Sequence, residues 1–511
     1  MALSRWIVHT VPVGLLCLAL TAGDAAAASD SRLADALQRQ ETSAVAALLA
    51  KGADPNGRQA DGTTALSWAA HWDDLATADR LLKAGAQANV ANDLGVTPLA
   101  LACQNGSIAM ATRLIEAGAD TNAAKKTGET PVMTAAFTGN AALVALLLKH
   151  GADPNRVAND TKQTALMWAI SERHSDVVNA LVAAGADVKA RTDAGFSPLL
   201  FAARSGDVAS ARLLLDSGAD PNDRARDGSS VLVVAVASGR EDVAELLLER
   251  GADPNAAGSG YTALHVAVPK DLRRAVKALL AKGADPNARV KSAPATLFGP
   301  GRGAGSEVPP LPGEPAVPPS QAASFAGATP FWLAAKHVNV EVMEILRAAG
   351  ADISLTNDTR TTPLMVAAGI TQVQGPRAKR GDVSQFYSNW GEADALETIR
   401  YLLRHGASIE TRNASGQTAL HGAAYMGSKA VAALLLDKGA AIDAQDSQGQ
   451  TPYRLAEGHL NVASQGVTEW PETAALFKAR GANTSLGVDG RTMLRQYVSA
   501  NGDAPARSVQ R

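Results

Sequence analysis

The chain has 511 residues and a formal net charge of −2 at pH 7, and 46% of its residues are hydrophobic while only 4% are aromatic. This nearly neutral balance supplies no strong positive field, which argues against a nucleic-acid partner. Many alanines and leucines with few bulky side chains are typical of small, closely packed helices and argue against one large central core.

Residues 1–28 have the pattern of a signal peptide. Arg5 gives a basic start, residues 11–22 form an apolar stretch, and small residues run up to Ala28. The alternative is an anchoring membrane helix, but the apolar stretch is shorter than the roughly 20 residues that span a bilayer. The residue before Cys17 is a leucine, which argues against a lipoprotein signal. We therefore expect cleavage after Ala28, export to the periplasm or beyond the cell, and no stable membrane insertion afterwards.

A short turn-forming sequence recurs along the chain. Gly-Ala-Asp-Pro-Asn begins at residues 52, 151, 218, 251 and 283. In its looser form, Gly-Ala, the glycines stand at positions 52, 85, 118, 151, 185, 218, 251, 283, 350, 406, 439 and 481. Most successive spacings are close to 33 residues, and such a period predicts an array of stacked supersecondary units.

Residues 97–122 show how one unit is built. Thr97 can cap a helix with its hydroxyl, and Pro98 suits the first helical position because its missing N–H is not needed there. Gly106 ends this first helix, and apolar residues at helical spacing predict a second helix that runs to Gly118. Turn-forming residues then lead to the next unit. The repeated sequence is therefore interpreted as a helix terminator followed by a turn.

These units resemble ankyrin repeats. Openings of the Thr-Pro-Leu type recur before the first helix of each unit, as at Thr97, Thr130 and Thr362. The resemblance covers residues 31–485 and implies an all-α repeat solenoid of about 11–12 stacked helix-turn-helix units with hairpin-like fingers. The histidine of the family's opening survives only as His265 and His421. We therefore expect the hydrogen bonds that it makes between neighbouring repeats to be missing elsewhere.

Two long intervals divide the array. Eight prolines and a glycine-rich run lie between positions 290 and 328, which excludes a hidden further repeat. A second insertion, residues 371–392, falls between the two helices of one unit, and a shorter one precedes Pro471. The predicted organisation is a signal peptide (1–28), an N-terminal array (29–289), a Pro/Gly-rich loop (290–328), a C-terminal array (329–486) and a tail (487–511).

Motifs of known catalytic or metal sites are absent from the sequence, and the histidines lie far apart. Cys103 is the only cysteine after the leader and stands where other units have alanine, so we interpret it as a small buried hydrophobe. We predict no catalytic residue, no metal and no cofactor. An enzyme with an active site at the insertions is the least favoured alternative.

The resemblance implies a monomer that binds another protein through finger tips and through the ends of the first helices. Exposed apolar, aromatic and basic side chains at these positions, and the aromatic residues of the second insertion, are the candidates for contact. They are His71, Trp72, Phe137, Phe196, Tyr261, Lys336, His337, Phe386, Tyr387, Trp390, Tyr425 and Met426. Trp68 and Trp168 stand earlier in their helices, where core packing is the favoured interpretation. A secreted effector that binds a host protein is the alternative to a periplasmic scaffold.

The C-terminal third is predicted to hold the main binding surface because both long insertions lie there. Phe386, Tyr387 and Trp390 either contact the partner or pin their loop to the array, and the sequence leaves both alternatives open. If neither insertion matters, the site is expected on the regular early repeats around Trp72 and Phe137.

Overall fold

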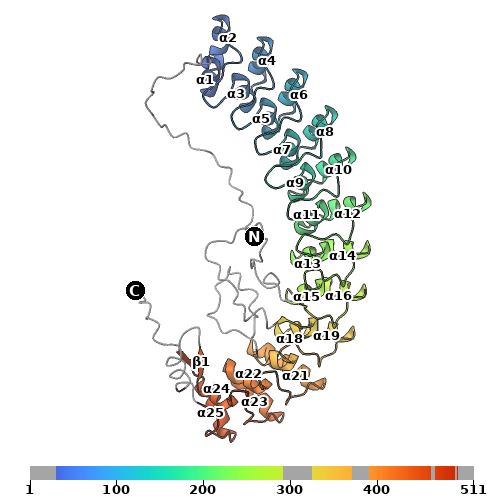
Figure 1. Cartoon of the computed structure of the whole chain (residues 1–511), viewed down its shortest axis with the longest axis vertical. Helices are drawn as coiled ribbons and strands as arrows, with labels where there is room; N and C mark the ends of the chain where they lie inside the picture. The colour runs from blue at the N-terminus through green and yellow to red at the C-terminus, as the bar shows by residue number, and fades with distance from the viewer. Residues whose placement is uncertain (1–29, 292–324, 371–390, 462–465, 489–491, 493–511) are drawn as a thin grey trace. The chain divides into compact units, whose positions relative to one another are not determined.

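The computed structural model describes residues 30–291, 325–370, 391–461, 466–488 and 492. The chain divides into two compact units, Met1–Lys126 and Thr127–Arg511. The described residues form 24 helices and two short strands. The helices come in successive pairs, which Figure 1 shows for each unit. The prediction of an all-α repeat array is confirmed.

The first unit contains three helix pairs. Their ranges are α1 (Arg32–Gln38), α2 (Thr42–Ala50), α3 (Ala65–His71), α4 (Leu75–Lys83), α5 (Pro98–Asn105) and α6 (Ile108–Glu116). The first helices of the pairs, α1, α3 and α5, contact one another in order, and so do the second helices α2, α4 and α6. Each repeat therefore adds one helix to a layer of first helices and one helix to a layer of second helices.

The second unit contains nine helix pairs built in the same way. Their ranges are α7 (Pro131–Thr138), α8 (Ala141–Lys149), α9 (Ala165–Ser171), α10 (Ser175–Ala183), α11 (Pro198–Ser205), α12 (Val208–Asp216), α13 (Val231–Ala237), α14 (Glu241–Glu249), α15 (Ala263–Ala267), α16 (Arg273–Ala281), α18 (Pro330–Lys336), α19 (Val340–Ala348), α20 (Pro363–Ala367), α21 (Glu392–Arg404), α22 (Ala419–Met426), α23 (Lys429–Asp437), α24 (Pro452–Glu457) and α25 (Pro471–Ala479). First helices again contact first helices, and second helices contact second helices.

The pairs on either side of the proline-rich segment stack directly on each other. Helix α15 contacts α18, and α16 contacts α19. Asn287 donates from Nδ2 to the carbonyl oxygen of Gly350 over 3.1 Å, which joins the same two repeats. The two pairs are therefore neighbours in the stack, whereas residues 292–324, for which the sequence predicts a loop without a further repeat, lie outside the described residues.

The helix signals predicted from the sequence act as expected in the repeat formed by α5 and α6. The Thr97 hydroxyl accepts a hydrogen bond from the N–H of Ala100 over 3.2 Å. Gly106 follows α5 with φ = 69° and Gly118 follows α6 with φ = 85°, a region that a residue without a Cβ enters readily. All twelve glycines of the Gly-Ala sequence have positive φ. The recurring glycine is thus required by the turn that ends each second helix.

The asparagine four residues after the recurring glycine has a second role. Asn222 donates from Nδ2 to the carbonyl oxygen of Gly251 over 3.3 Å and accepts from the N–H of Asp253 over 2.7 Å. The same two bonds reach the next repeat from Asn56, Asn89, Asn155, Asn255 and Asn287. The asparagine therefore satisfies a helix-end carbonyl of the following repeat and fixes the step between repeats. Sequence reasoning identified only its turn-forming role.

The expectation that inter-repeat bonds are missing wherever the histidine is absent is wrong for one repeat. His421 makes this contact from Nε2 to the carbonyl oxygen of Gln450 over 3.2 Å. Trp332 stands at the corresponding position, three residues after its capping threonine, and donates from Nε1 to the carbonyl oxygen of Thr361 over 2.9 Å. The indole N–H replaces the imidazole N–H because both can reach a backbone carbonyl of the next finger.

The last repeat contains a feature that the sequence did not predict. Strands β1 (His459–Asn461) and β2 (Gly466–Thr468) pair antiparallel between α24 and α25. This hairpin occupies the short insertion before Pro471.

Candidate functional site

Three aromatic side chains gather at the end of α3 in the first unit, and we call Trp68, His71 and Trp72 the N-terminal aromatic cluster. The indole rings of Trp68 and Trp72 stack with centroids 6.1 Å apart, and His71 meets Trp72 edge-on at 4.6 Å. Trp72 is 43% exposed, but its Nε1 donates to the carbonyl oxygen of Leu37 over 3.0 Å. Its ring is therefore accessible and held in one orientation.

Trp68 is less buried than the sequence predicted. The sequence favoured core packing for it, whereas the structure leaves it half-buried within the N-terminal aromatic cluster. Its Nε1 donates to Oε1 of Gln59 over 2.7 Å, and Gln59 in turn donates to Gln38 over 2.7 Å. Gln38 thus holds Gln59 in place, and Gln59 in turn orients the indole ring of Trp68.

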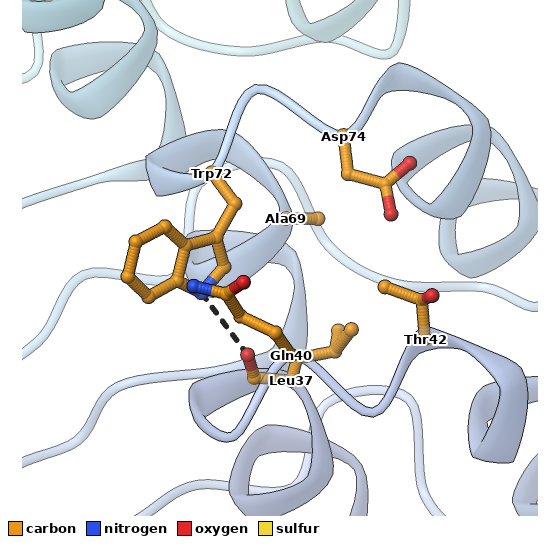
Figure 2. Close-up of a pocket in the computed structure, with 6 residues that line it drawn as sticks. All are labelled: Leu37, Gln40, Thr42, Ala69, Trp72 and Asp74. Carbon is orange, nitrogen blue, oxygen red and sulfur yellow. Dashed lines mark hydrogen bonds between the residues drawn. The ribbon is translucent and has the colours of Figure 1, made fainter.

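A pocket of about 290 Å³ opens beside Trp72. It is lined by Leu37, Gln40, Thr42, Ala69, Trp72 and Asp74. Figure 2 shows the indole on one side of this space and the polar side chains of Thr42 and Asp74 on the other. Asp74 already accepts the N–H of Thr77 over 2.9 Å as the cap of α4. The pocket is at the small end of the range for ligand sites and suits a single side chain better than a drug-sized molecule.

A second exposed aromatic lies in the second unit, where α7 ends. Phe137 is 51% exposed and meets the half-buried Trp168 edge-on, with ring centroids 6.0 Å apart. Nε2 of His174 contacts the carbonyl oxygen of Phe137 at 3.1 Å. The ring of Phe137 is thus exposed on a backbone that the next repeat holds in place.

Three arginines follow along the same row of helix ends, and we call Arg173, Arg204 and Arg240 the arginine cluster. Arg173 donates to the carbonyl oxygen of Ser205, and Arg240 donates from Nε to that of Arg204 over 3.3 Å. Both bonds satisfy carbonyl groups at the end of α11, which a helix leaves without internal partners. The guanidinium of Arg204 lies 5.1 Å from the ring centroid of Phe201 and 5.6 Å from that of Phe196.

Two predicted contact residues are not exposed, and the expectation of exposure is wrong for both. Tyr261 is only 7% exposed. Lys336 is 5% exposed with its Nζ 5.4 Å from the ring centroid of Phe325, and this burial lowers the pKa of Lys336 to about 8. A position at the end of a first helix thus does not guarantee exposure, because Phe325 packs against Trp332 and Lys336 of α18.

The remaining predicted residues are placed as follows. Phe196, His337 and Met426 are half-buried, whereas His71 is exposed and Tyr425 is 36% exposed. Nε2 of His337 is buried without a hydrogen-bond partner among the described residues, and burial together with the charge of Lys336 lowers the pKa of this histidine to about 4. Phe386, Tyr387 and Trp390 lie outside the described residues, so the alternatives for them stay predictions.

Within the described part of the chain, no group of three or more His, Cys, Asp or Glu side chains is placed to hold a metal ion. Cys103 is fully buried, and this burial raises the pKa of its thiol to about 12. The interpretation of Cys103 as a small buried hydrophobe is confirmed, since a thiol with such a pKa carries almost no thiolate at neutral pH. Among the described helices, none is both long and apolar enough to cross a membrane.

Helices that come in pairs and stack pair upon pair along the chain define a repeat protein. The family described as "Ankyrin repeats (3 copies)" matches residues 33–125, 113–192, 199–290 and 390–465, and "Ankyrin repeat" matches residues 326–358. These matches cover more than half of the chain. The chain belongs to the ankyrin-repeat family, whose repeats mediate contacts between proteins.

Curated relatives are similar to parts of the chain. A probable 26S proteasome regulatory subunit p28 from Saccharomyces cerevisiae is 32% identical over 31% of this chain and 61% of its own length. The E3 ubiquitin-protein ligase Ufd4 from Drosophila melanogaster is 39% identical over 19% of this chain and 4% of its own. Protein fem-1 homolog A-like from Mus musculus is 35% identical over 21% and 16%. In each case the match covers less than two thirds of the relative's length.

Proposed function

We propose that this protein is an exported scaffold that binds another protein and catalyses no reaction. The N-terminal aromatic cluster supports the proposal most directly. An exposed tryptophan whose orientation is fixed before binding loses little entropy when a partner covers it, and tryptophan is among the residues that dominate binding energy. The adjoining pocket gives a partner side chain a place to enter beside Trp72.

Export rests on residues 1–28, whose basic start, apolar stretch and small residues before Ser29 have the signal-peptide pattern. We expect the mature protein to begin at Ser29 and to be found in a periplasmic extract. N-terminal sequencing checks this expectation. Met1 retained in a membrane pellet would contradict it, and recovery of the mature chain mainly from the culture medium would favour the secreted effector.

Replacing Trp72 with Ala should weaken capture of the partner by about 2 kcal/mol or more, because a preorganised aromatic anchor is lost. The partner is first isolated with the wild-type chain, and its dissociation constant is then measured for each variant. Ile108→Ala is the matched control, since Ile108 is also an exposed apolar residue (42%) but belongs to α6, a second helix.

The control variant should bind the partner as the wild type does. Trp72→Phe keeps an aromatic ring but not the bond to Leu37, so it should fall between wild type and Trp72→Ala. Equal loss in the Trp72 and Ile108 variants, or no loss in either, would place the contact away from this cluster.

A further inference from the structure

The arginine cluster concentrates positive charge in a chain whose net charge is only −2. All three side chains are exposed. Arg173 and Arg240 converge on Gly206, where an added Cβ would lie 2.9 Å from Nη2 of Arg173 and 3.0 Å from Nε of Arg240. Two like charges therefore share one small space, which is unfavourable unless an anion joins them.

Within the described part of the chain, the guanidinium groups of the arginine cluster are not neutralised by carboxylates. Among the described residues, no ion pair involves Arg173, Arg204 or Arg240, although other arginines there form several. Two nearby acids have other partners. Asp207 accepts the N–H and the hydroxyl of Ser210 over 3.1 and 2.5 Å, and Glu241 accepts the N–H of Ala275 over 2.8 Å.

The existing hydrogen bonds orient the guanidinium groups without using up their donors. A guanidinium carries five N–H donors in a planar fork that fits a carboxylate through two parallel bonds. Arg173 and Arg240 each have one bond to a carbonyl at the end of α11, and Arg204 is steadied by the rings of Phe196 and Phe201. Several donors of each fork therefore remain for a ligand, and the side chains that carry them are already ordered.

An apolar neighbour adjoins the arginine cluster. Helices α7, α9, α11 and α13 contact one another in this order. The exposed Phe137 lies in the last turn of α7 and meets Trp168 of α9. Arg204 lies in the last turn of α11, and Arg173 and Arg240 lie in the turns that follow α9 and α13. One row of helix ends thus passes from aromatic to mainly basic, with Glu172 at the end of α9 as an exposed acid beside Arg173.

We propose that this row binds an acidic segment of a partner protein, with Asp or Glu carboxylates on the arginine cluster and an apolar side chain on Phe137 and Trp168. The inference rests on the proposed protein-binding function and assigns the chemistry of the partner. The carboxylate is favoured over the phosphate backbone of a nucleic acid because the cluster is local and the chain as a whole is slightly acidic.

The test uses the full chain and the fluorescein-labelled peptide Glu-Asp-Glu-Phe-Glu-Asp-Glu, with binding followed by fluorescence anisotropy. The wild type should bind this peptide, and binding should weaken when salt is raised because exposed charges are screened. The double variant Arg173→Gln/Arg240→Gln should bind at least about tenfold more weakly. Arg250→Gln is the control, since Arg250 is paired with Asp216 over 2.7 Å on the other helix layer, and it should bind as the wild type does.

Further variants and peptides separate the proposal from its alternatives. Arg173→Lys/Arg240→Lys keeps the charge but not the planar fork and should recover only part of the affinity. The amide peptide Gln-Asn-Gln-Phe-Gln-Asn-Gln should not bind. Equal binding of the acidic peptide to the wild type and the double Gln variant, no binding to either, or stronger binding of duplex DNA than of the peptide would overturn the proposal.

The Trp72→Ala variant distinguishes this proposal from the proposed function. It should bind the acidic peptide as the wild type does while it loses the partner. If the acidic peptide does not bind but capture of the partner still depends on Trp72, the proposal of an acidic segment is wrong and the proposed scaffold function stands. If the peptide binds through the arginine cluster but Trp72 is unimportant for capture, the aromatic cluster is not the anchor.

Discussion

Replacing Trp332 with Ala should lower the free energy of unfolding of the surrounding repeats by about 3–5 kcal/mol. Trp332 is fully buried, packs edge-on against Phe325 with centroids 6.2 Å apart, and makes the bond to Thr361 that joins two repeats. The substitution leaves a large cavity and a carbonyl without its partner, and both effects are destabilising. Hydrogen exchange under native conditions measures the loss repeat by repeat.

The loss should remain local because, among the described residues, each pair of helices packs mainly on its neighbours in the array. Protection should fall mainly in α18 and α19 and in the adjacent pairs, α15 with α16 and α20 with α21. Trp332→His is the matched variant, because His421 shows that an imidazole at this position can bond the next finger. It should be less destabilising than Ala. Uniform loss of protection from α1 to α25 would show that the array unfolds as one block.

The repeat array could be predicted from local signals in the sequence. Threonine caps such as Thr97 and helix-ending glycines such as Gly118 act within one turn of helix, so their meaning does not depend on the rest of the fold. The regular spacing of these signals predicts that the repeats stack, since the chain must reverse direction in the same way in every repeat. The helix pairs of the structure follow these signals closely.

Contacts between repeats were less accessible to sequence reasoning. The bonds of Asn222 to the next repeat, and the replacement of a histidine by Trp332, depend on which atoms a side chain reaches about 29 residues later in the chain. Lys336 was misjudged for the same reason, since Phe325 covers it from another segment. The position of a residue in its own helix says little about what neighbouring segments place upon it.

The candidate site was predicted in part. Trp72 and Phe137 were named from their positions at helix ends, and both are exposed. Arg173 and Arg240 were missed because they follow the first helices, in the turns to the second ones, where the sequence shows no unusual pattern. A comparison of the residues from the end of each first helix to the start of the second would have shown basic side chains in three successive repeats, together with the acidic Glu172 and Asp207.

Lowering the pH from 7 to 5 should destabilise the repeats of His265, His337 and His421, because the pKa of each of these histidines is lowered. His265 is fully buried; its Nδ1 accepts the N–H of Thr262 over 3.1 Å, and its Nε2 contacts the carbonyl oxygen of Ala288 at 3.0 Å. This arrangement suits the neutral ring with its proton on Nε2. Burial lowers the pKa of His265 to about 4, although the backbone bond to Ala288 and the charge of Asp285 oppose the shift.

The sign of the effect follows from proton uptake. An unfolded histidine has a pKa near 6.5, so between pH 6.5 and pH 4 the unfolded chain binds a proton that folded His265 does not. Acidification therefore favours unfolding, and from pH 7 to pH 5 each such histidine should cost about 2 kcal/mol. His337, whose pKa is also lowered to about 4 by burial and by Lys336, should add a similar loss. His421 acts in the same direction, since burial lowers its pKa too.

Hydrogen exchange at pH 7 and pH 5, corrected for the intrinsic exchange rates, should show the loss around α15, α18 and α22. The matched variant is His265→Gln, because a glutamine at this position can accept the same N–H from Thr262 and does not titrate. The variant should keep most of its stability at pH 5 around α15 while α18 and α22 still lose theirs. The same pH dependence around α15 in wild type and variant would show that His265 is not the group that titrates, and that the acid sensitivity of this repeat has another source.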